Sequence, residues 1–128
     1  MNSVPFWDDG DTISSVCLVP ITGATFVSIS AGMTNGLPTI SPCVAGASAF
    51  GVAAFDGAAG DVITVHHARG MVNAVLTGAA IAPGALVMSD AIGRAITYVV
   101  AVGNSCLGRS LDSVATAVLA PIDSAATG

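Results

Sequence analysis

The sequence predicts an all-β fold, a small β-barrel or β-tulip-like domain of short hairpins with an extended N-terminal arm. Two observations lead to this fold class. The 128 residues include no Glu, Lys or Gln, so strong helix formers other than Ala and Leu are scarce. The 15 Gly and 6 Pro interrupt most windows that are long enough for a helix. We predict an arm over residues 1–13, a single β domain over 14–123 and a flexible tail over 124–128.

The clearest predicted hairpin lies in the second half of the chain. A turn at Pro83-Gly84 precedes a short strand over Leu86–Met88, and the chain returns along Arg94–Tyr98. The chain reverses over Ser89–Gly93, in which the loop Asp90–Gly93 has turn-favouring residues at both ends, and its final glycine can take the positive φ that closes such a turn. This pattern predicts two paired strands and nothing catalytic.

Further β-prone runs precede this hairpin. Ser14–Ile21 and Ala24–Ser30 are two of them, separated by a Thr-Gly turn. Leu37–Pro42 contains two prolines and is therefore at best an edge strand. Phe50–Phe55 indicates a short buried strand, and Val62–His66 indicates a strand whose alternate side chains face opposite ways.

A weak internal repeat emerges when the chain from Phe50 is laid on the chain from Leu107. Gly51 then coincides with Gly108, and Ala53 coincides with Ser110. The match predicts repeated hairpin units, in which Val114–Pro121 would be the second counterpart of Val62–Val65.

The chain has few charges and many apolar residues. Only 9% of its residues are charged, against about 25% in an average soluble domain, and 53% are hydrophobic, so we expect other subunits to cover part of the surface. The net charge of −5 repels phosphate backbones, which argues against nucleic acid as a partner. The least polar stretch, Met71–Met88, is interrupted by polar residues and by Pro-Gly. It falls short of the roughly 20 apolar residues that span a bilayer, so no membrane partner is expected.

No arrangement of residues is typical of an active site. His66 and His67 are neighbours on a predicted strand, so their side chains point to opposite faces and cannot easily bind one metal ion together. No G-x-S-x-G motif is present, and the pattern gives no support to a Cys106–His66 pair. Cys17, Cys43 and Cys106 form no CxxC motif, which indicates buried thiols in a reducing cytosol. We expect no metal, no cofactor and no enzymatic activity.

The N-terminal stretch Met1–Asp11 differs from the rest of the chain. It carries the adjacent aromatic residues Phe6 and Trp7, followed by acidic residues, in a chain with 5% aromatics. Such a pair on an extended arm suggests an anchor that docks onto a partner, because aromatic side chains contribute much of the energy at interfaces. The alternative is that the arm folds back onto its own domain, since aromatic side chains are buried wherever they can be.

Two stretches carry a resemblance to a known family. Arg69–Thr97 contains I-A-P-G-A-L-V and closes a hairpin through D-A-I-G-R-A. Phe50–Val65 has the sequence F-G-V-A-A-F-D-G-A-A-G-D-V-I-T-V and is echoed by Cys106–Leu119. Together these stretches resemble the capsid decoration, or cement, proteins of tailed bacteriophages. The resemblance implies a β-rich, often trimeric protein that binds the outside of an assembled head, reinforces contacts between capsomers and has no enzymatic activity.

The resemblance also implies where the protein acts and what it binds. We expect its partners to be the major capsid protein and further copies of the same chain, as a homotrimer. Its place would be the outer capsid surface of a virion, after synthesis in the host cytoplasm. The residues that we predict at the capsid or subunit interface are Phe6, Trp7, Asp8, Asp9, Asp90 and Arg94. Deleting residues 1–11 should then abolish capsid binding without unfolding the domain.

Two other functions remain open at the level of sequence. One is a small-ligand or carbohydrate-binding β module, in which Arg94, Asp90 and His67 would converge in a concave pocket. The other is a different virion or tail component built from the same hairpins. A homotrimer with an exposed arm would favour the cement function, and a monomer with a deep pocket would favour ligand binding.

Overall fold

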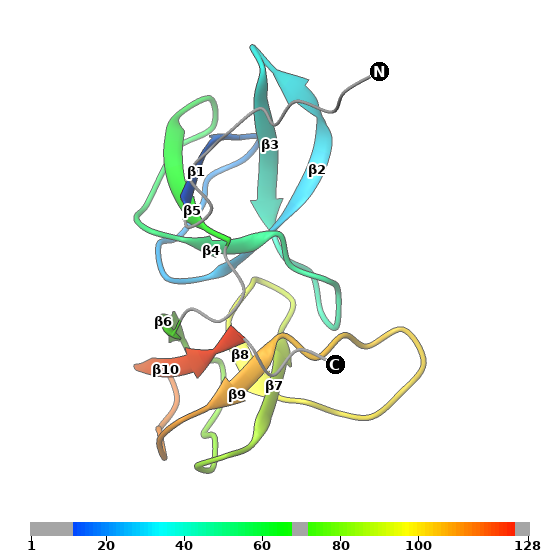
Figure 1. The fold of residues 1–128 in the computed structure, drawn as a ribbon, viewed down its shortest axis with the longest axis vertical. Helices are drawn as coiled ribbons and strands as arrows, with labels where there is room; N and C mark the ends of the chain where they lie inside the picture. The colour runs from blue at the N-terminus through cyan, green and yellow to red at the C-terminus, as the bar shows by residue number, and fades with distance from the viewer. Residues whose placement is uncertain (1–11, 68–71, 125–128) are drawn as a thin grey trace, which may run out of the picture.

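The structure, a computed structural model, describes residues 12–67 and 72–124 and consists of two lobes stacked along the long axis of the molecule (Figure 1). The upper lobe in this view is a closed barrel, and the lower lobe is a five-stranded sheet. The described residues form ten strands and no α-helix, which confirms the all-β prediction. Accordingly, no helix that could cross a membrane occurs in this part of the chain.

The barrel is built from the first half of the chain. Its strands are β1 (Thr12–Cys17), β2 (Phe26–Thr34), β3 (Leu37–Pro42), β4 (Gly51–Ala53) and β5 (Val62–His66). β1 closes the barrel because it pairs antiparallel with β5 on one side and parallel with β3 on the other. The alternation predicted for β5 is confirmed, since every second side chain is buried. The core of the barrel comprises Ile13, Cys17, Ile21, Val27, Ile40, Ala53, Ile63 and Val65.

The first strand starts inside the predicted arm. β1 begins at Thr12, two residues before the boundary predicted at 13/14, because Thr12 and Ile13 pair with His66 and Val65 of β5. The rest of the predicted arm, residues 1–11, lies outside the described residues, as do residues 125–128 of the predicted tail.

The second half of the chain forms the lower sheet. Its strands are β6 (Val72–Leu76), β7 (Leu86–Ser89), β8 (Ala95–Thr97), β9 (Gly108–Ser110) and β10 (Leu119–Asp123), in the order β6-β10-β9-β7-β8. The predicted hairpin is confirmed as β7 and β8, which pair antiparallel around the turn. Gly93 has φ +87°, which is the positive value expected for the residue that closes this turn.

β3 is an internal strand and not the edge strand that its prolines predicted. It pairs antiparallel with β2 and parallel with β1, so both of its edges are occupied. The β2–β3 ladder is irregular around Pro38, where register shifts leave this residue without a paired partner. Pro42 is the last residue of the strand. Prolines at a bulge and at a strand end remove no essential ladder hydrogen bond, which is why an internal strand tolerates both.

The two lobes repeat one pattern of strand pairing. Every barrel ladder except that of β1 with β3 has a counterpart in the sheet, and two examples of matching registers are Val16↔Val62 with Leu76↔Leu119, and Val27↔Gly51 with Val87↔Gly108. The turns match as well, since Ile21 exchanges two backbone hydrogen bonds with Gly57, and Ile81 does the same with Val114. The predicted internal repeat is therefore confirmed. The counterpart of Val62–Val65, however, is Leu119–Ile122 and not Val114–Pro121.

The lobes differ in how far they close. In the barrel, β3 pairs with β1 in parallel through a two-residue register, Val16↔Thr39 and Cys17↔Ile40. In the lower lobe, the equivalent side carries one isolated parallel bridge, Thr77↔Ala95. β8 is only three residues long and cannot extend this pairing. The lower sheet therefore stays open, with β6 and β8 at its edges.

Phe26 of β2 holds the two lobes together. Its side chain is 3% exposed and packs in a cluster made mainly by the lower lobe, with Cys43, Val52, Val75, Ile81, Val87, Ala95, Leu107, Ala120 and Ile122. The amide of Phe26 donates to the carbonyl of Gly93 (2.7 Å), and the amide of Leu76 donates to the carbonyl of Ala24 (2.7 Å). Because apolar and backbone contacts both cross the junction, we expect the lobes to unfold in one transition.

The buried thiol of Cys17 makes stability depend on alkaline pH. Burial, and then the negative charge of Asp61, raise the pKa of this thiol. In the unfolded chain a Cys titrates near about 8.5. The thiol therefore stays protonated to a higher pH in the folded state than in the unfolded chain. Its contribution to the free energy of unfolding is complete below about pH 8.5 and is lost as pH rises toward the higher folded pKa. Urea denaturation at about pH 7 and about pH 9.5 should show this decrease.

Cys17→Ala is the matched variant for this prediction. It removes the titrating thiol, so its stability should fall less steeply with pH than that of the wild type. Equal pH slopes in the two proteins would show that Cys17 contributes nothing to the effect.

Candidate functional site

The most exposed apolar side chains lie on two loops at one side of the molecule. The loop of residues 98–107 joins β8 to β9, and its Val100 and Val102 are 86% and 106% exposed. The loop of residues 43–50 joins β3 to β4 and carries exposed Val44. Figure 1 shows both loops, in teal and in yellow to orange, on the right of the molecule. We call the side chains of Val44, Val99, Val100 and Val102 the valine surface.

Hydrogen bonds fix the shape of these loops. Asn104 closes the longer loop, since its amide donates to the carbonyl of Ala101 (3.2 Å) and its Nδ2 donates to the carbonyl of Val99 (3.0 Å). The amide of Ser105 donates to the carbonyl of Gly46 (2.8 Å), which ties the two loops together. Gly46 has φ +71°, and a Cβ there would overlap the Asn104 side chain, so glycine is favoured at this position. Loops held in this way lose little conformational entropy when they bind.

The repeat explains why the two loops meet. Each follows the hairpin of its own lobe and precedes the strand, β4 or β9, that begins the second part of the repeat. The loop after β8 is the longer of the two and projects farther. No Asp, Glu, Lys or Arg occurs between Arg94 and Arg109. An uncharged, protruding apolar surface costs little to desolvate and is typical of a contact with another protein.

Asp90 and Arg94, two of the predicted interface residues, bind each other within the β7–β8 turn. The amides of Ile92 (3.0 Å) and Arg94 (2.8 Å) donate to Asp90 Oδ1, and Arg94 Nε donates to Oδ2 (2.8 Å). These bonds hold the turn in shape. They leave the side chain of Asp90 only 14% exposed. Whether Arg94, at 34%, also contacts a partner stays a prediction. The other predicted residues, Phe6, Trp7, Asp8 and Asp9, lie outside the described residues.

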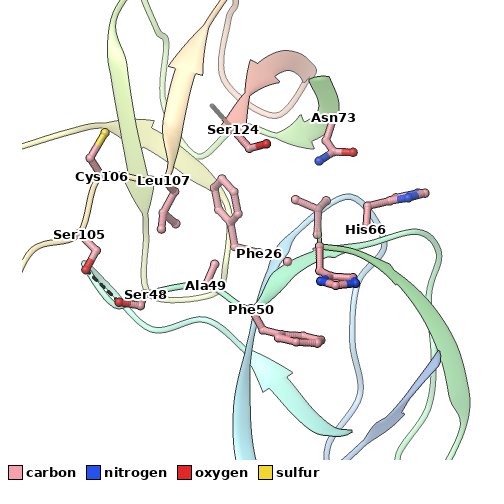
Figure 2. Close-up of a pocket in the computed structure, with 13 residues that line it drawn as sticks. Phe26, Ser48, Ala49, Phe50, His66, Asn73, Ser105, Cys106, Leu107 and Ser124 are labelled. Atoms are coloured by element: carbon pink, nitrogen blue, oxygen red, sulfur yellow. Dashed lines mark hydrogen bonds between the residues drawn. The ribbon is translucent and has the colours of Figure 1, made fainter. Parts of the chain in front are cut away.

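A cavity of about 270 Å³ lies between the lobes (Figure 2). His67 lines it and stacks on Phe50, with ring centroids 5.6 Å apart and an interplanar angle of 8°. Asp90 and Arg94 do not line this cavity, so the structure does not bring together the three residues predicted for a ligand pocket. His66 lines the cavity as well. Side chains of neighbouring strand residues were predicted to face opposite ways, but β5 ends at His66, so both histidines can line one cavity at the end of this strand.

The described residues that line the cavity do not bring together the Cys106–His66 pair or a metal site. Cys106 and His66 both line it, but Figure 2 shows them on opposite sides, with Phe26 and Leu107 between them. Among residues 12–67 and 72–124, no group of three or more His, Cys, Asp or Glu side chains could hold a metal ion.

Sequence reasoning did not identify the valine surface. The run V-V-A-V over residues 99–102 has the composition of a buried strand, and strand propensity was the only signal that it offered. The following Gly103-Asn104 is a turn signal that could have marked the run as a loop.

Residues 8–120 match a family described as phage cement protein. No curated protein matches the chain significantly. Among solved structures, the chain is similar to the N base of head fiber gp8.5 in bacteriophage phi29, with a TM-score of 0.73 and 16% sequence identity, over 87% of this chain and 90% of that chain. A likeness at this identity concerns the fold alone. The family match, in contrast, spans most of the sequence, and the chain therefore belongs to the phage cement protein family.

Proposed function

We propose that the protein binds the outer surface of a phage head and stabilises the contacts between its capsomers, with the valine surface as the main contact. Membership of the cement family supports the location on the capsid. The observation that carries the proposal is the exposure of Val100 and Val102, at 86% and 106%, on a loop braced by hydrogen bonds. Such side chains gain burial only when a partner covers them.

Stabilisation follows from selective binding. A protein that binds assembled shell and not free coat subunits stabilises the shell by RT ln(1 + [L]/Kd) at each site, which is about 2.7 kcal/mol when the ligand concentration is 100 times Kd. The major capsid protein is the proposed partner, and the low charge of the chain suits tight packing against it. No reaction is needed for this role, and we propose that the protein is not an enzyme.

We further propose that the protein acts as a homotrimer. The 9% charged residues leave much apolar surface that other copies could cover. Three linked valine surfaces would bind the lattice with an avidity above that of one, provided that their spacing fits the lattice. Synthesis in the host cytoplasm agrees with three buried free thiols.

A ligand-binding function has weaker support. Small-molecule sites usually enclose about 300–1,000 Å³ and combine an apolar lining with convergent polar groups. The cavity at the junction, and a second one of about 440 Å³ beside it, both lack the predicted Asp90 and Arg94. We therefore do not propose a ligand-binding module.

The experiment that tests the proposal has two parts. Light scattering of the purified protein gives its oligomeric state, and co-sedimentation compares its binding to assembled heads and to unassembled coat subunits. We expect a trimer that pellets with heads, does not associate with free subunits and raises the temperature at which the heads disrupt. Equal binding to free subunits, or no binding to heads, would contradict a role in reinforcing the shell.

A further inference from the structure

The repeat allows the outward faces of the two lobes to be compared position by position. Along β6 and β10, as along β1 and β5, every second side chain is buried and the alternate ones face outward. The matching registers assign each outward position of the lower sheet one equivalent position in the barrel. Equivalent positions share their backbone geometry, so a consistent difference in their chemistry points to a difference in what the two lobes contact.

The lower sheet is the more apolar of the two at each of five outward positions. Two positions exchange a hydroxyl-bearing residue for an apolar one, and three exchange a smaller apolar residue for leucine. With the barrel residue first, the pairs are Ser14 and Ala74, Thr64 and Pro121, Val16 and Leu76, Val62 and Leu119, and Ala54 and Leu111. Leu111 is included because its amide donates to the carbonyl of Pro121 (2.9 Å), as the amide of Ala54 donates to that of Thr64 (2.9 Å). We call Ala74, Leu76, Leu111, Leu119 and Pro121 the β10 face.

The β10 face is open to solvent on a single chain. Leu119 and Leu111 are 56% and 53% exposed, Ala74 is exposed, and Leu76 and Pro121 are partly buried. The barrel folds with more polar residues at the same positions, so the fold itself does not require this apolar surface. A contiguous apolar face that its own fold does not require is typical of a surface that another protein molecule covers.

The distribution of charge favours a second copy of this chain as that molecule. The net charge of −5 makes two copies repel wherever their acidic side chains come close, but none of the five residues is charged. Arg109 and Asp123 lie opposite each other at one end of the face, and a second copy presents the same pair, so each charge can meet its opposite. Asp112 follows Leu111, but its carboxylate accepts the amide of Ser113 in its own turn (2.8 Å).

The β10 face and the valine surface belong to different parts of the lower lobe. Figure 1 shows β6 and β10 on the left of this lobe and the loop of residues 98–107 on its right. A contact through the β10 face therefore leaves the valine surface free for the head. Two separate apolar surfaces call for two partners, and the proposed function supplies them as the coat protein and another copy of the chain.

We propose that the β10 face is the contact between copies of this chain, with the faces of three copies packed together around the axis of the homotrimer. The inference rests on the homotrimer of the proposed function and identifies the surface that builds it. Around a closed threefold axis each face meets two others, so a narrow face on every chain encloses one shared apolar core. Leu119 and Leu111 form the centre of the contact, because they are the largest and most exposed side chains of the face.

Leu119→Asp tests the proposal in the free protein. The position is more than half exposed, so the single chain should still fold. In the trimer the new carboxylates would be buried near the axis without partners. Light scattering should therefore show a fall in mass from three chains to one. Val62→Asp is the matched control, since Val62 occupies the equivalent position and is 55% exposed, and this variant should remain trimeric. Circular dichroism and urea denaturation verify that both variants are folded.

A crosslinking experiment tests the same contact without introducing a charge. The native thiols of Cys17, Cys43 and Cys106 are buried, so a short bismaleimide should react mainly with an introduced thiol. Each maleimide adds one thiol across its double bond, and no oxidant is needed. Leu119→Cys should give covalently joined chains on a denaturing gel at low protein concentration. Val62→Cys and the wild type should give single chains.

The outcomes separate this contact from the function on which it rests. A wild-type trimer that persists in Leu119→Asp, with no crosslinking of Leu119→Cys, would overturn the β10 face as the contact and leave the homotrimer standing. If that trimeric variant also failed to pellet with heads, the face would belong to the contact with the coat protein. A wild-type monomer would overturn both the contact and the homotrimer, and pelleting of this monomer with heads would leave the capsid function standing.

Discussion

Replacing Val100 and Val102 with aspartate is expected to abolish binding to phage heads while changing the free energy of unfolding by no more than about 0.5 kcal/mol. Both side chains are exposed and contact little of their own domain, so folding should not depend on them. At a docked interface each charge would be buried without a partner. Residues that dominate an interface contribute about 2 kcal/mol or more each, so the pair would lose about 4 kcal/mol, which corresponds to a loss of affinity on the order of 1,000-fold.

The control for this variant adds the same charge elsewhere. Val62→Asp with Val118→Asp changes two exposed valines, 55% and 42% exposed, that are not part of the valine surface. Co-sedimentation over a range of protein concentrations gives the affinity of each protein for heads. We expect binding by the control and none by the loop variant. If the loop variant binds as the wild type does, the valine surface is not the contact, and the trimer and capsid proposals must rest on another face.

Phe26→Ala is expected to lower the free energy of unfolding by about 3–5 kcal/mol, the range for removing a buried phenylalanine side chain. This is a large fraction of the 5–15 kcal/mol that is typical of a whole domain. The loss should be large because the ring belongs to β2 of the barrel yet fills a cluster formed mainly by the lower lobe. Its removal leaves a cavity where the lobes join.

The repeat supplies a matched control for Phe26. Leu86 begins β7 as Phe26 begins β2, and it directly precedes the register Val87↔Gly108 that corresponds to Val27↔Gly51. Leu86 is only half-buried, so Leu86→Ala should cost clearly less than Phe26→Ala. Urea denaturation followed by circular dichroism measures both. Equal losses in the two variants, or a loss below about 1 kcal/mol for Phe26→Ala, would show that the ring does not hold the lobes together.

Local patterns predicted the elements whose determinants are local. The β7–β8 hairpin has its turn residues between two β-prone runs, and Val62–His66 shows its alternation within five residues. Whether β3 is an edge strand or an internal strand could not be predicted in the same way. Its prolines argue for an edge, but β1 becomes its second neighbour only because the barrel closes, and a bulge accommodates Pro38.

The candidate site was predicted less well than the fold, for a related reason. The V-V-A-V run of residues 99–102 has strand composition, yet none of the described strands pairs with it, and the turn at Asn104 leaves it exposed to solvent. Asp90 and Arg94 looked available for a partner in the sequence. In the folded chain the Asp90 carboxylate is largely taken up by its own turn.

By itself, the sequence determined the all-β class, the hairpins, the repeat and the absence of charge from the loop before β9, because backbone propensity and turn chemistry act over a few neighbouring residues. Only the tertiary structure decided which lobe closes, how the loops of residues 43–50 and 98–107 meet, and that a cavity lies between the lobes. These features join residues far apart in the chain. The entropy of closing such long loops is offset only when many contacts form together, so no short stretch of sequence encodes them.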